Sequence, residues 1–306
     1  MSVSMRRRLL VGALGTAALL VALAPAGAAS AGNRNHGSSV SVGNLVLQPT
    51  ERGYRGTLPI TITLRGTADV LPVVTVTEPV GGSFTGLLPE GPCFPLNDGP
   101  RRTVNCTIDR FEPGERRTVY AEFEVLTDAR RYPMVATGGR VDVSVDSVPV
   151  RGGEAFSALF RSTTGSVRHP LPYVQDTVAD GSVRVGPAVL NQQADGGYAG
   201  QVSITVGYRS DAPHDELQVQ LGLPEGVRTG EGVFCPFARC VVPGGEFMPG
   251  EVRTFDVPLT AEADTVAGPL GDATAQLHLP YGNTETPDSN PADNAATFTV
   301  TAVPAA

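Results

Sequence analysis

Residues 59–64 read Pro-Ile-Thr-Ile-Thr-Leu, and this stretch decides the fold class. Its apolar side chains, Ile60, Ile62 and Leu64, recur at every second position, so in a β-strand they share one face while the threonines between them face water. No window of about 11 residues beyond the N-terminal segment sustains an apolar stripe at helical spacing. The sequence therefore predicts an all-β protein. The same alternation occurs in three further segments: 118–125, 140–145 and 217–221.

The chain contains one unit twice. Residues 40–47 (Val-Ser-Val-Gly-Asn-Leu-Val-Leu) reappear as 183–190 (Val-Arg-Val-Gly-Pro-Ala-Val-Leu). Further landmarks recur in the same order, which predicts an internal duplication. These landmarks are Gly-Tyr-x-Gly at 53–56 and 197–200, Leu-Pro-Glu-Gly at 88–91 and 223–226, a cysteine pair in each copy, and Phe-x-Pro-Gly-Glu at 111–115 and 247–251. In the last of them, Pro and Gly occupy the second and third positions of a type II β-turn.

Each copy has the strand and turn spacing of a small β domain. About seven short strands in roughly 125 residues, with turns every 8–12 residues, are typical of an immunoglobulin-like β-sandwich. A closed barrel is the alternative. We expect two tandem immunoglobulin-like domains at residues 38–165 and 174–303, joined by a Pro-rich linker at 166–173. A short polar tail at 32–37 is expected to be disordered.

The N-terminus has the plan of a secretory signal peptide. Three Arg at 6–8 precede an apolar run at 9–24, and Ala29-Ser30-Ala31 forms a small-residue cleavage site. We expect removal of residues 1–31. The apolar run is too short for a membrane span, which needs about 18 residues, so we expect no stable transmembrane anchor in the mature chain. The protein is therefore expected to be secreted, either free or wall-associated, by the general secretory or the twin-Arg route.

The charge balance limits the classes of partner. All 23 basic residues are Arg, and the chain carries a net charge of −8 at pH 7. Without residues 1–31 the chain keeps 20 basic and 31 acidic residues, a net charge of −11. Such a surface repels nucleic acid, so we expect no nucleic-acid partner. A phosphate-binding P-loop needs a Lys and is excluded.

The cysteines form two local pairs, Cys93 with Cys106 and Cys235 with Cys240. Although four cysteines allow three connectivities, their spacing favours a disulfide within each copy over a zinc site, whose pairs are typically two residues apart. The second pair encloses only four residues. We therefore expect a rigid, exposed tip there, with Phe237 and Arg239 as the candidate partner-binding residues.

Other polar clusters have simpler structural explanations. His214, in the acidic segment 211–216, suits either a metal ligand or, as we expect, a charged loop tip. Residues 288–294 (Asp-Ser-Asn-Pro-Ala-Asp-Asn) suit either calcium or the favoured Asx/Pro turn before a last strand. Ser83 lies in a glycine-rich loop that lacks a nucleophile elbow. We therefore expect no catalytic residue, metal or cofactor.

The C-terminal segment carries a family resemblance. Residues 288–300 (Asp-Ser-Asn-Pro-Ala-Asp-Asn-Ala-Ala-Thr-Phe-Thr-Val), the Pro-Gly-Glu turns and the paired cysteines resemble the conserved-repeat and cell-adhesion-related immunoglobulin-like domains of exported bacterial surface proteins, actinobacterial ones among them. The resemblance is clearest over 182–303 and weaker over 38–165. It implies a stalk or spacer module, and no enzymatic residue comes with it.

These observations favour a secreted, non-enzymatic structural or adhesive protein. Its expected partner is an extracellular protein or a cell-wall polymer. The alternative is a pair of carbohydrate-binding modules. Sugar platforms rely on exposed aromatic rings, whereas the chain has no Trp, and Tyr54 and Tyr198 fall at equivalent repeat positions expected to be buried.

Overall fold

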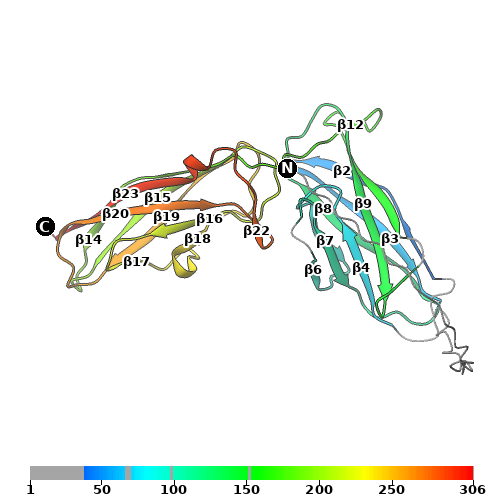
Figure 1. The fold of residues 1–306 in the computed structure, drawn as a ribbon, viewed down its shortest axis with the longest axis horizontal. Helices are drawn as coiled ribbons and strands as arrows, with labels where there is room; N and C mark the ends of the chain where they lie inside the picture. The colour runs from blue at the N-terminus through cyan, green and yellow to red at the C-terminus, as the bar shows by residue number, and fades with distance from the viewer. Residues whose placement is uncertain (1–37, 66–69, 97–98, 151–152, 306) are drawn as a thin grey trace, which may run out of the picture. The chain divides into compact units, whose positions relative to one another are not determined.

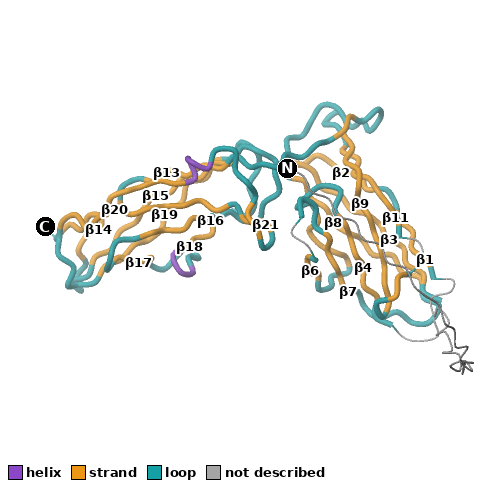
Figure 2. Tube along the Cα trace, viewed as in Figure 1, coloured by secondary structure: helices purple, strands orange, loops and turns teal. Residues whose placement is uncertain are grey.

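Strands and the loops between them make up nearly all of the described chain (Figures 1 and 2). The computed structural model describes residues 38–65, 70–96, 99–150 and 153–305. The predicted signal peptide at 1–31 and tail at 32–37 lie outside these residues. Within the described ranges the helices are two short 3-10 turns, η1 (Pro236–Ala238) and η2 (Pro291–Asn294), and none is long and apolar enough to cross a membrane. The all-β prediction is confirmed.

The first half of the described chain forms one large sheet. Its main path of paired strands runs β5-β8-β3-β2-β11-β9-β4-β7-β6. Outside this path, β1 pairs with β3, and both β10 and β12 pair with β9. The strands are β1 (Ser39–Val42), β2 (Leu45–Thr50), β3 (Gly53–Thr63), β4 (Pro72–Thr77), β5 (Phe84–Leu88), β6 (Cys93–Pro95), β7 (Thr103–Thr107), β8 (Arg116–Val125), β9 (Met134–Val145), β10 (Val148–Pro149), β11 (Glu154–Phe160) and β12 (Leu171–Pro172).

The second half forms another large sheet, with the path β17-β19-β15-β14-β23-β20-β16-β18 and with β13 paired to β15. A separate hairpin joins β21 and β22. The strands are β13 (Gly181–Val185), β14 (Ala188–Gln192), β15 (Tyr198–Tyr208), β16 (Gln218–Gly222), β17 (Val227–Thr229), β18 (Arg239–Val241), β19 (Val252–Ala261), β20 (Gly268–His278), β21 (Pro280–Tyr281), β22 (Thr284–Glu285) and β23 (Ala295–Val303).

The two sheets have the same topology, as the internal repeat predicts. The first eight strands of the first path match the second path one by one. The path β5-β8-β3-β2-β11-β9-β4-β7 corresponds in this order to β17-β19-β15-β14-β23-β20-β16-β18. In both halves the strand that pairs with β8 or β19, namely β5 or β17, precedes a strand that carries a cysteine, β7 or β18. The first sheet adds one further edge strand, β6.

Each half is barrel-like, with one continuous sheet. In the first half, β2 pairs in parallel with β11 through Leu45 to Leu47 and antiparallel with β3 through Gln48 to Thr50. In the second half, β14 pairs with both β15 and β23. The expected sandwich of two separate sheets is therefore not established, because one strand joins the two faces by hydrogen bonds. The arrangement is a half-barrel, closer to the barrel alternative.

The alternating segments form the strands and cores that their periodicity predicts. Ile60 and Ile62 are fully buried and Leu64 is 3% exposed, while Thr61 is half-buried and its hydroxyl lies 2.9 Å from that of Thr118 on β8. The other three alternating segments lie within or overlap β8, β9 and β16. Each half has its own apolar cluster, so burial of one strand face drives the folding of each.

The Phe-x-Pro-Gly-Glu segments form the predicted turns. In the second half Glu251 N–H donates to the Met248 carbonyl at 3.0 Å, and Gly250 has φ of 81°. The Glu251 carboxylate accepts from Arg253 Nε at 2.7 Å, and that guanidinium lies 3.9 Å from the centre of the buried Phe247 ring. The first half repeats this arrangement with Phe111, Glu112, Gly114, Glu115 and Arg117.

One sequence landmark does not occupy equivalent positions. Residues 88–91 (Leu-Pro-Glu-Gly) begin at the end of β5, and their Leu88-Pro89 peptide bond is cis. Residues 223–226, with the same sequence, precede β17, which is the topological counterpart of β5. This part of the inferred alignment is therefore wrong, because turns between strands favour the same few residue types wherever they occur.

A glycine substitution tests the shared turn. Gly114→Ala and Gly250→Ala should each lower the free energy of unfolding by about 1 kcal/mol, because a side chain in the left-handed region is strained. No heavy atom would contact the added Cβ at either position, so the two costs should be similar. They can be measured by equilibrium urea unfolding.

The control is Gly186→Ala, where the added Cβ also meets no atom and φ lies outside the left-handed region. Its effect should stay within about 0.5 kcal/mol. An equal loss in all three variants would contradict the assignment of strain to the turns.

Candidate functional site

Both disulfides lie at the same edge of their sheets. Cys93 on β6 is directly opposite Cys106 on β7, and their sulfurs are bonded at 2.05 Å. In the second half Cys240, on β18, is bonded to Cys235. Cys106 and Cys240 are fully buried. Each half thus has a covalently held loop at a sheet edge, and two disulfides indicate an oxidising, extracellular type of setting.

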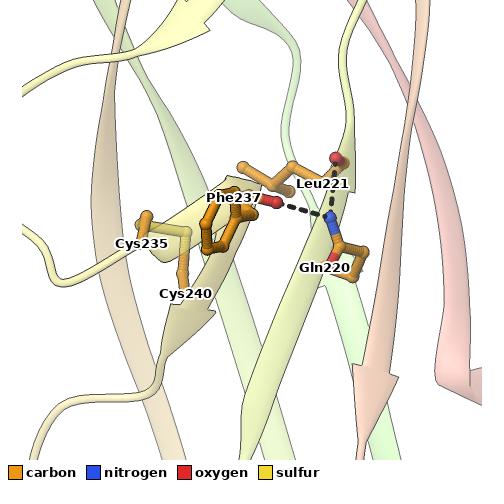
Figure 3. Close-up of a disulfide and its surroundings, with 5 residues drawn as sticks. All are labelled: Gln220, Leu221, Cys235, Phe237 and Cys240. Atoms are coloured by element: carbon orange, nitrogen blue, oxygen red, sulfur yellow. Dashed lines mark hydrogen bonds between the residues drawn. A yellow bond between two sulfur atoms is a disulfide. The ribbon is translucent and has the colours of Figure 1, made fainter.

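The four residues between Cys235 and Cys240 present an aromatic ring to solvent. Phe237 is 99% exposed, and its φ of 53° lies in the left-handed region. Its carbonyl accepts a hydrogen bond from Gln220 Nε2 at 3.2 Å, and the same amide lies 3.4 Å from the Leu221 carbonyl (Figure 3). The disulfide and Gln220 therefore hold the backbone of the loop while the ring stays free to contact another molecule.

Arg239, the first residue of β18, takes part in a chain of polar contacts that runs to β20 and β22. Its Nη2 lies 3.3 Å from each ring nitrogen of His278. His278 Nδ1 in turn lies 2.6 Å from a carboxylate oxygen of Glu285. Arg239 is exposed, as expected, and it places a cationic group two positions after Phe237 in the chain.

The first half has an exposed apolar tip beside its own disulfide, which the sequence analysis did not single out. Phe94 is 64% exposed and Leu96 is 58% exposed. In the second half Phe234, just before Cys235, is 73% exposed. We call Phe94 and Leu96 the first tip, and Phe234 and Phe237 the second tip. The signal in the sequence was an aromatic residue within two positions of a cysteine in both copies.

His214 is not on a charged loop tip. The side chain is buried, and its ring centre is 4.3 Å from that of Tyr208. Nε2 accepts from the Phe247 backbone N–H at 2.9 Å, so the proton is on Nδ1, which donates to the Ala212 carbonyl at 3.1 Å. Burial lowers the pKa of His214 below its ordinary value. Both nitrogens are used by the backbone, so the residue is a structural core histidine.

The acidic neighbours of His214 make contacts with the first half of the chain. All described residues belong to one compact unit. Asp211 accepts hydrogen bonds from Thr127 Oγ1 at 3.0 Å and from the Tyr173 hydroxyl at 2.7 Å. Asp215 forms an ion pair with Arg102. The expectation of a solvated loop at 211–216 is therefore wrong for these residues, whose carboxylates are used in internal contacts.

Two further carboxylates have raised pKa values without forming a reactive site. Glu78 is fully buried and accepts from the backbone N–H groups of Gly82, Phe84 and Arg102 at 2.8 to 3.0 Å. Burial raises its pKa. For Glu246, burial and then the charge of Asp215 raise the pKa to about 7. Glu246 borders a cavity of about 20 Å³, far below the roughly 300 to 1,000 Å³ of ligand pockets.

No described group of three or more His, Cys, Asp or Glu side chains is arranged to hold a metal ion. The strongest candidate site is therefore a binding surface, made of the second tip with Arg239 and of the matching first tip.

Comparisons with known proteins assign no family. No family model matches the chain, and no curated protein matches it. Among solved structures, the crystal structure of red sea bream transglutaminase is similar over 86% of this chain with 10% sequence identity and a TM-score of 0.23. The match covers 31% of the transglutaminase chain. A likeness at this level carries no argument about activity.

The two disulfides should differ in their effect on stability. Replacing both cysteines by Ala should cost about 3 kcal/mol for Cys93 and Cys106 and about 2 kcal/mol for Cys235 and Cys240, because the longer loop gains more entropy when opened. The bridged residues are 13 and 5 positions apart. Equilibrium urea unfolding measures both values.

Each pair contains one fully buried cysteine, so the loss of packing is similar and largely cancels in the difference. A larger loss at Cys235 and Cys240 would contradict the entropic account.

His214 should make the protein sensitive to acid. Its folded-state pKa is lowered, so the unfolded chain binds the proton first as pH falls below about 6.5. The contribution of neutral His214 to the free energy of unfolding is fully present above that pH and is lost as pH falls toward the folded-state pKa. Asp215 and Glu251 favour the charged form and Arg253 opposes it, but burial is the largest cause. Urea unfolding between pH 7 and pH 5 should show this loss as a difference between the wild-type chain and His214→Gln, because protonation of Glu78 and Glu246, whose folded-state pKa values are raised, stabilises both chains as the pH falls.

His214→Gln should reduce the loss of unfolding free energy between pH 7 and pH 5. His169→Gln, at an exposed position, should leave that loss unchanged. If His214→Gln does not fold, the NMR titration of the His214 ring in the native protein decides. A midpoint at or above 6.5 would contradict the prediction.

Proposed function

We propose that the chain is a secreted, non-enzymatic structural or adhesive protein built from two duplicated immunoglobulin-like modules. The single observation that carries the proposal is the second tip, where a disulfide-held loop presents a Phe237 ring that is 99% exposed. Aromatic rings and Arg are the side chains that contribute most to protein interfaces. A ring on a constrained backbone also loses little conformational entropy when it is covered.

The immunoglobulin-like assignment is supported by strand order. In each half the second strand lies beside the last strand of the repeat in parallel, β2 beside β11 and β14 beside β23. Antiparallel pairs fall on either side of them, β3 with β8 and β9 with β4 in the first half, and β15 with β19 and β20 with β16 in the second. Immunoglobulin-like domains place their first and last strands in the same way. The position of β5 and β17, ahead of the cysteine-bearing edge strands, departs from that order and is common to both halves.

The family resemblance adds the class of partner. Spacer modules of exported bacterial surface proteins hold their binding surfaces away from the cell, and the two disulfides suit that setting. We propose that the partner is an extracellular protein or a cell-wall polymer that covers the second tip.

A second candidate function is carbohydrate binding, favoured by a groove on the first half. The groove has a volume of about 600 Å³ and lies over β2, β3, β5 and β8. Amide, hydroxyl, guanidinium and carboxylate groups line it, and such groups pair with sugar hydroxyls. They are contributed by Asn44, Gln48, Arg55, Thr57, Glu122 and Glu124.

A binding assay separates the two functions. The purified mature chain is incubated with envelope fractions of the producing bacterium and with its isolated cell-wall polysaccharide. Phe237→Ala combined with Arg239→Ala should weaken retention at least about tenfold, because truncating a central aromatic and an Arg typically costs more than 1 kcal/mol. Gln48→Ala combined with Asn44→Ala should leave retention unchanged.

The matched control for the tip variant is Val266→Ala combined with Arg184→Ala, at two exposed positions elsewhere in the second half. Each variant is first shown to melt at the wild-type temperature. Loss confined to the groove variant would favour carbohydrate binding. If the tip variant is retained as well as the wild-type chain, or if the wild-type chain is not retained at all, the adhesive role of the second tip is refuted.

A further inference from the structure

The segment before the last strand is a turn whose backbone is well satisfied. Asp288 Oδ1 accepts from the backbone N–H of Asn290 at 2.7 Å, and Oδ2 accepts from that of Gly181 at 2.8 Å. Ser289 N–H donates to the Ala179 carbonyl at 2.9 Å. These bonds attach the segment to the start of β13 and lead into η2, as the favoured Asx/Pro turn predicts.

The turn leaves two side-chain oxygens without a partner. Asp293 Oδ1 and Asn294 Oδ1 are buried and accept no hydrogen bond, and Asn294 as a whole is 6% exposed. Both belong to η2, in adjacent positions. A buried polar atom without a partner is costly, and native proteins normally satisfy such atoms with water or an ion. The Asx/Pro turn explains Asp288, but it does not explain these two oxygens.

We propose that Asp288, Asp293 and Asn294 form a Ca²⁺ site at η2. This revises the expectation that the chain binds no metal. Every donor is a carboxylate or amide oxygen, the type that a hard cation prefers, and no His or Cys takes part. We include Asp288 as the third donor because its Oδ1 accepts from the backbone N–H of Asn290, the residue that precedes η2. Each of its oxygens keeps a second lone pair for the cation.

Calcium fits these donors better than magnesium. Three side chains supply fewer than the six to eight oxygens that Ca²⁺ takes, so backbone carbonyls and water complete its irregular shell. Magnesium requires near-ideal octahedral geometry at shorter distances. Two carboxylates give the site a low charge, so the affinity belongs to the weak extracellular class, with a Kd of about 10⁻⁴ to 10⁻³ M.

The duplication predicts the stoichiometry. The counterpart of β23 in the first half is β11, and the seven residues before it, 147–153 (Ser-Val-Pro-Val-Arg-Gly-Gly), contain no carboxylate or amide side chain. The site is therefore present once per chain. A general attraction of cations to the acidic surface would give many weak sites in both halves instead.

Calorimetric titration of the full mature chain with CaCl₂ tests the site. We expect one Ca²⁺ per chain, at least about tenfold weaker binding of MgCl₂, and a higher melting temperature in 10 mM CaCl₂ than in EDTA. Asp293→Asn should weaken Ca²⁺ binding at least tenfold and abolish the shift in melting temperature. Asp272→Asn, an exposed carboxylate on the adjacent β20, is the matched control and should change neither.

The opposite results are equally clear. No binding at 10 mM CaCl₂, several equivalent sites, equal binding of Mg²⁺, or full binding by Asp293→Asn would overturn the proposal. If Asp293→Asn does not fold, the backbone amide signals of Asp293 and Asn294 in the native protein decide. They should shift with Ca²⁺, and shifts confined to other residues would overturn it. None of these outcomes depends on whether the second tip binds a partner.

Discussion

One strand in each half determines whether its two faces form a single domain. β2 is hydrogen-bonded antiparallel to β3 and parallel to β11, and β14 makes the equivalent contacts with β15 and β23. The strand therefore ties the beginning of each copy to its end, across more than a hundred residues of chain. Leu47 and Leu190, at the same position of the repeated segment, are fully buried on these strands. β2 and β14 thus each carry a buried leucine and are hydrogen-bonded on two sides, at the place where each sheet would otherwise divide into two layers.

The cores built around these strands leave the sheet edges available for binding. An exposed edge needs protection against pairing with other chains, and each sheet has a disulfide at its cysteine-bearing end, between β6 and β7 in the first half and between Cys235 and β18 in the second. These disulfides constrain the backbone beside the exposed rings of the tips. The disulfides that stabilise these sheet ends therefore lie beside the proposed binding residues, while polar contacts of Asp211 and Glu78 hold loops elsewhere in the chain.

Local patterns predicted much of this arrangement. Alternation at 59–64 identified a central strand and its buried face, and the Phe-x-Pro-Gly-Glu segments identified a turn whose Gly250 is in the left-handed region. The cysteine spacing identified both bridges and the exposed Phe237. The prediction for His214 was wrong because its neighbours in sequence are charged, whereas its neighbours in space are Tyr208 and the backbone of Phe247. The first tip was missed because exposure depends on which strands cover a residue.

The sequence by itself determined the all-β class, the repeated unit and the residues that pair as disulfides, because these follow from period-two patterning and from spacings of a few residues. Only the tertiary structure decided that each half is a continuous half-barrel, that residues 88–91 and 223–226 are not equivalent, and that Asp293 and Asn294 leave two buried oxygens unsatisfied. These features depend on pairings between segments far apart in the chain. Hydrogen-bond partners and burial at such sites are properties of the assembled sheet, so no local pattern encodes them.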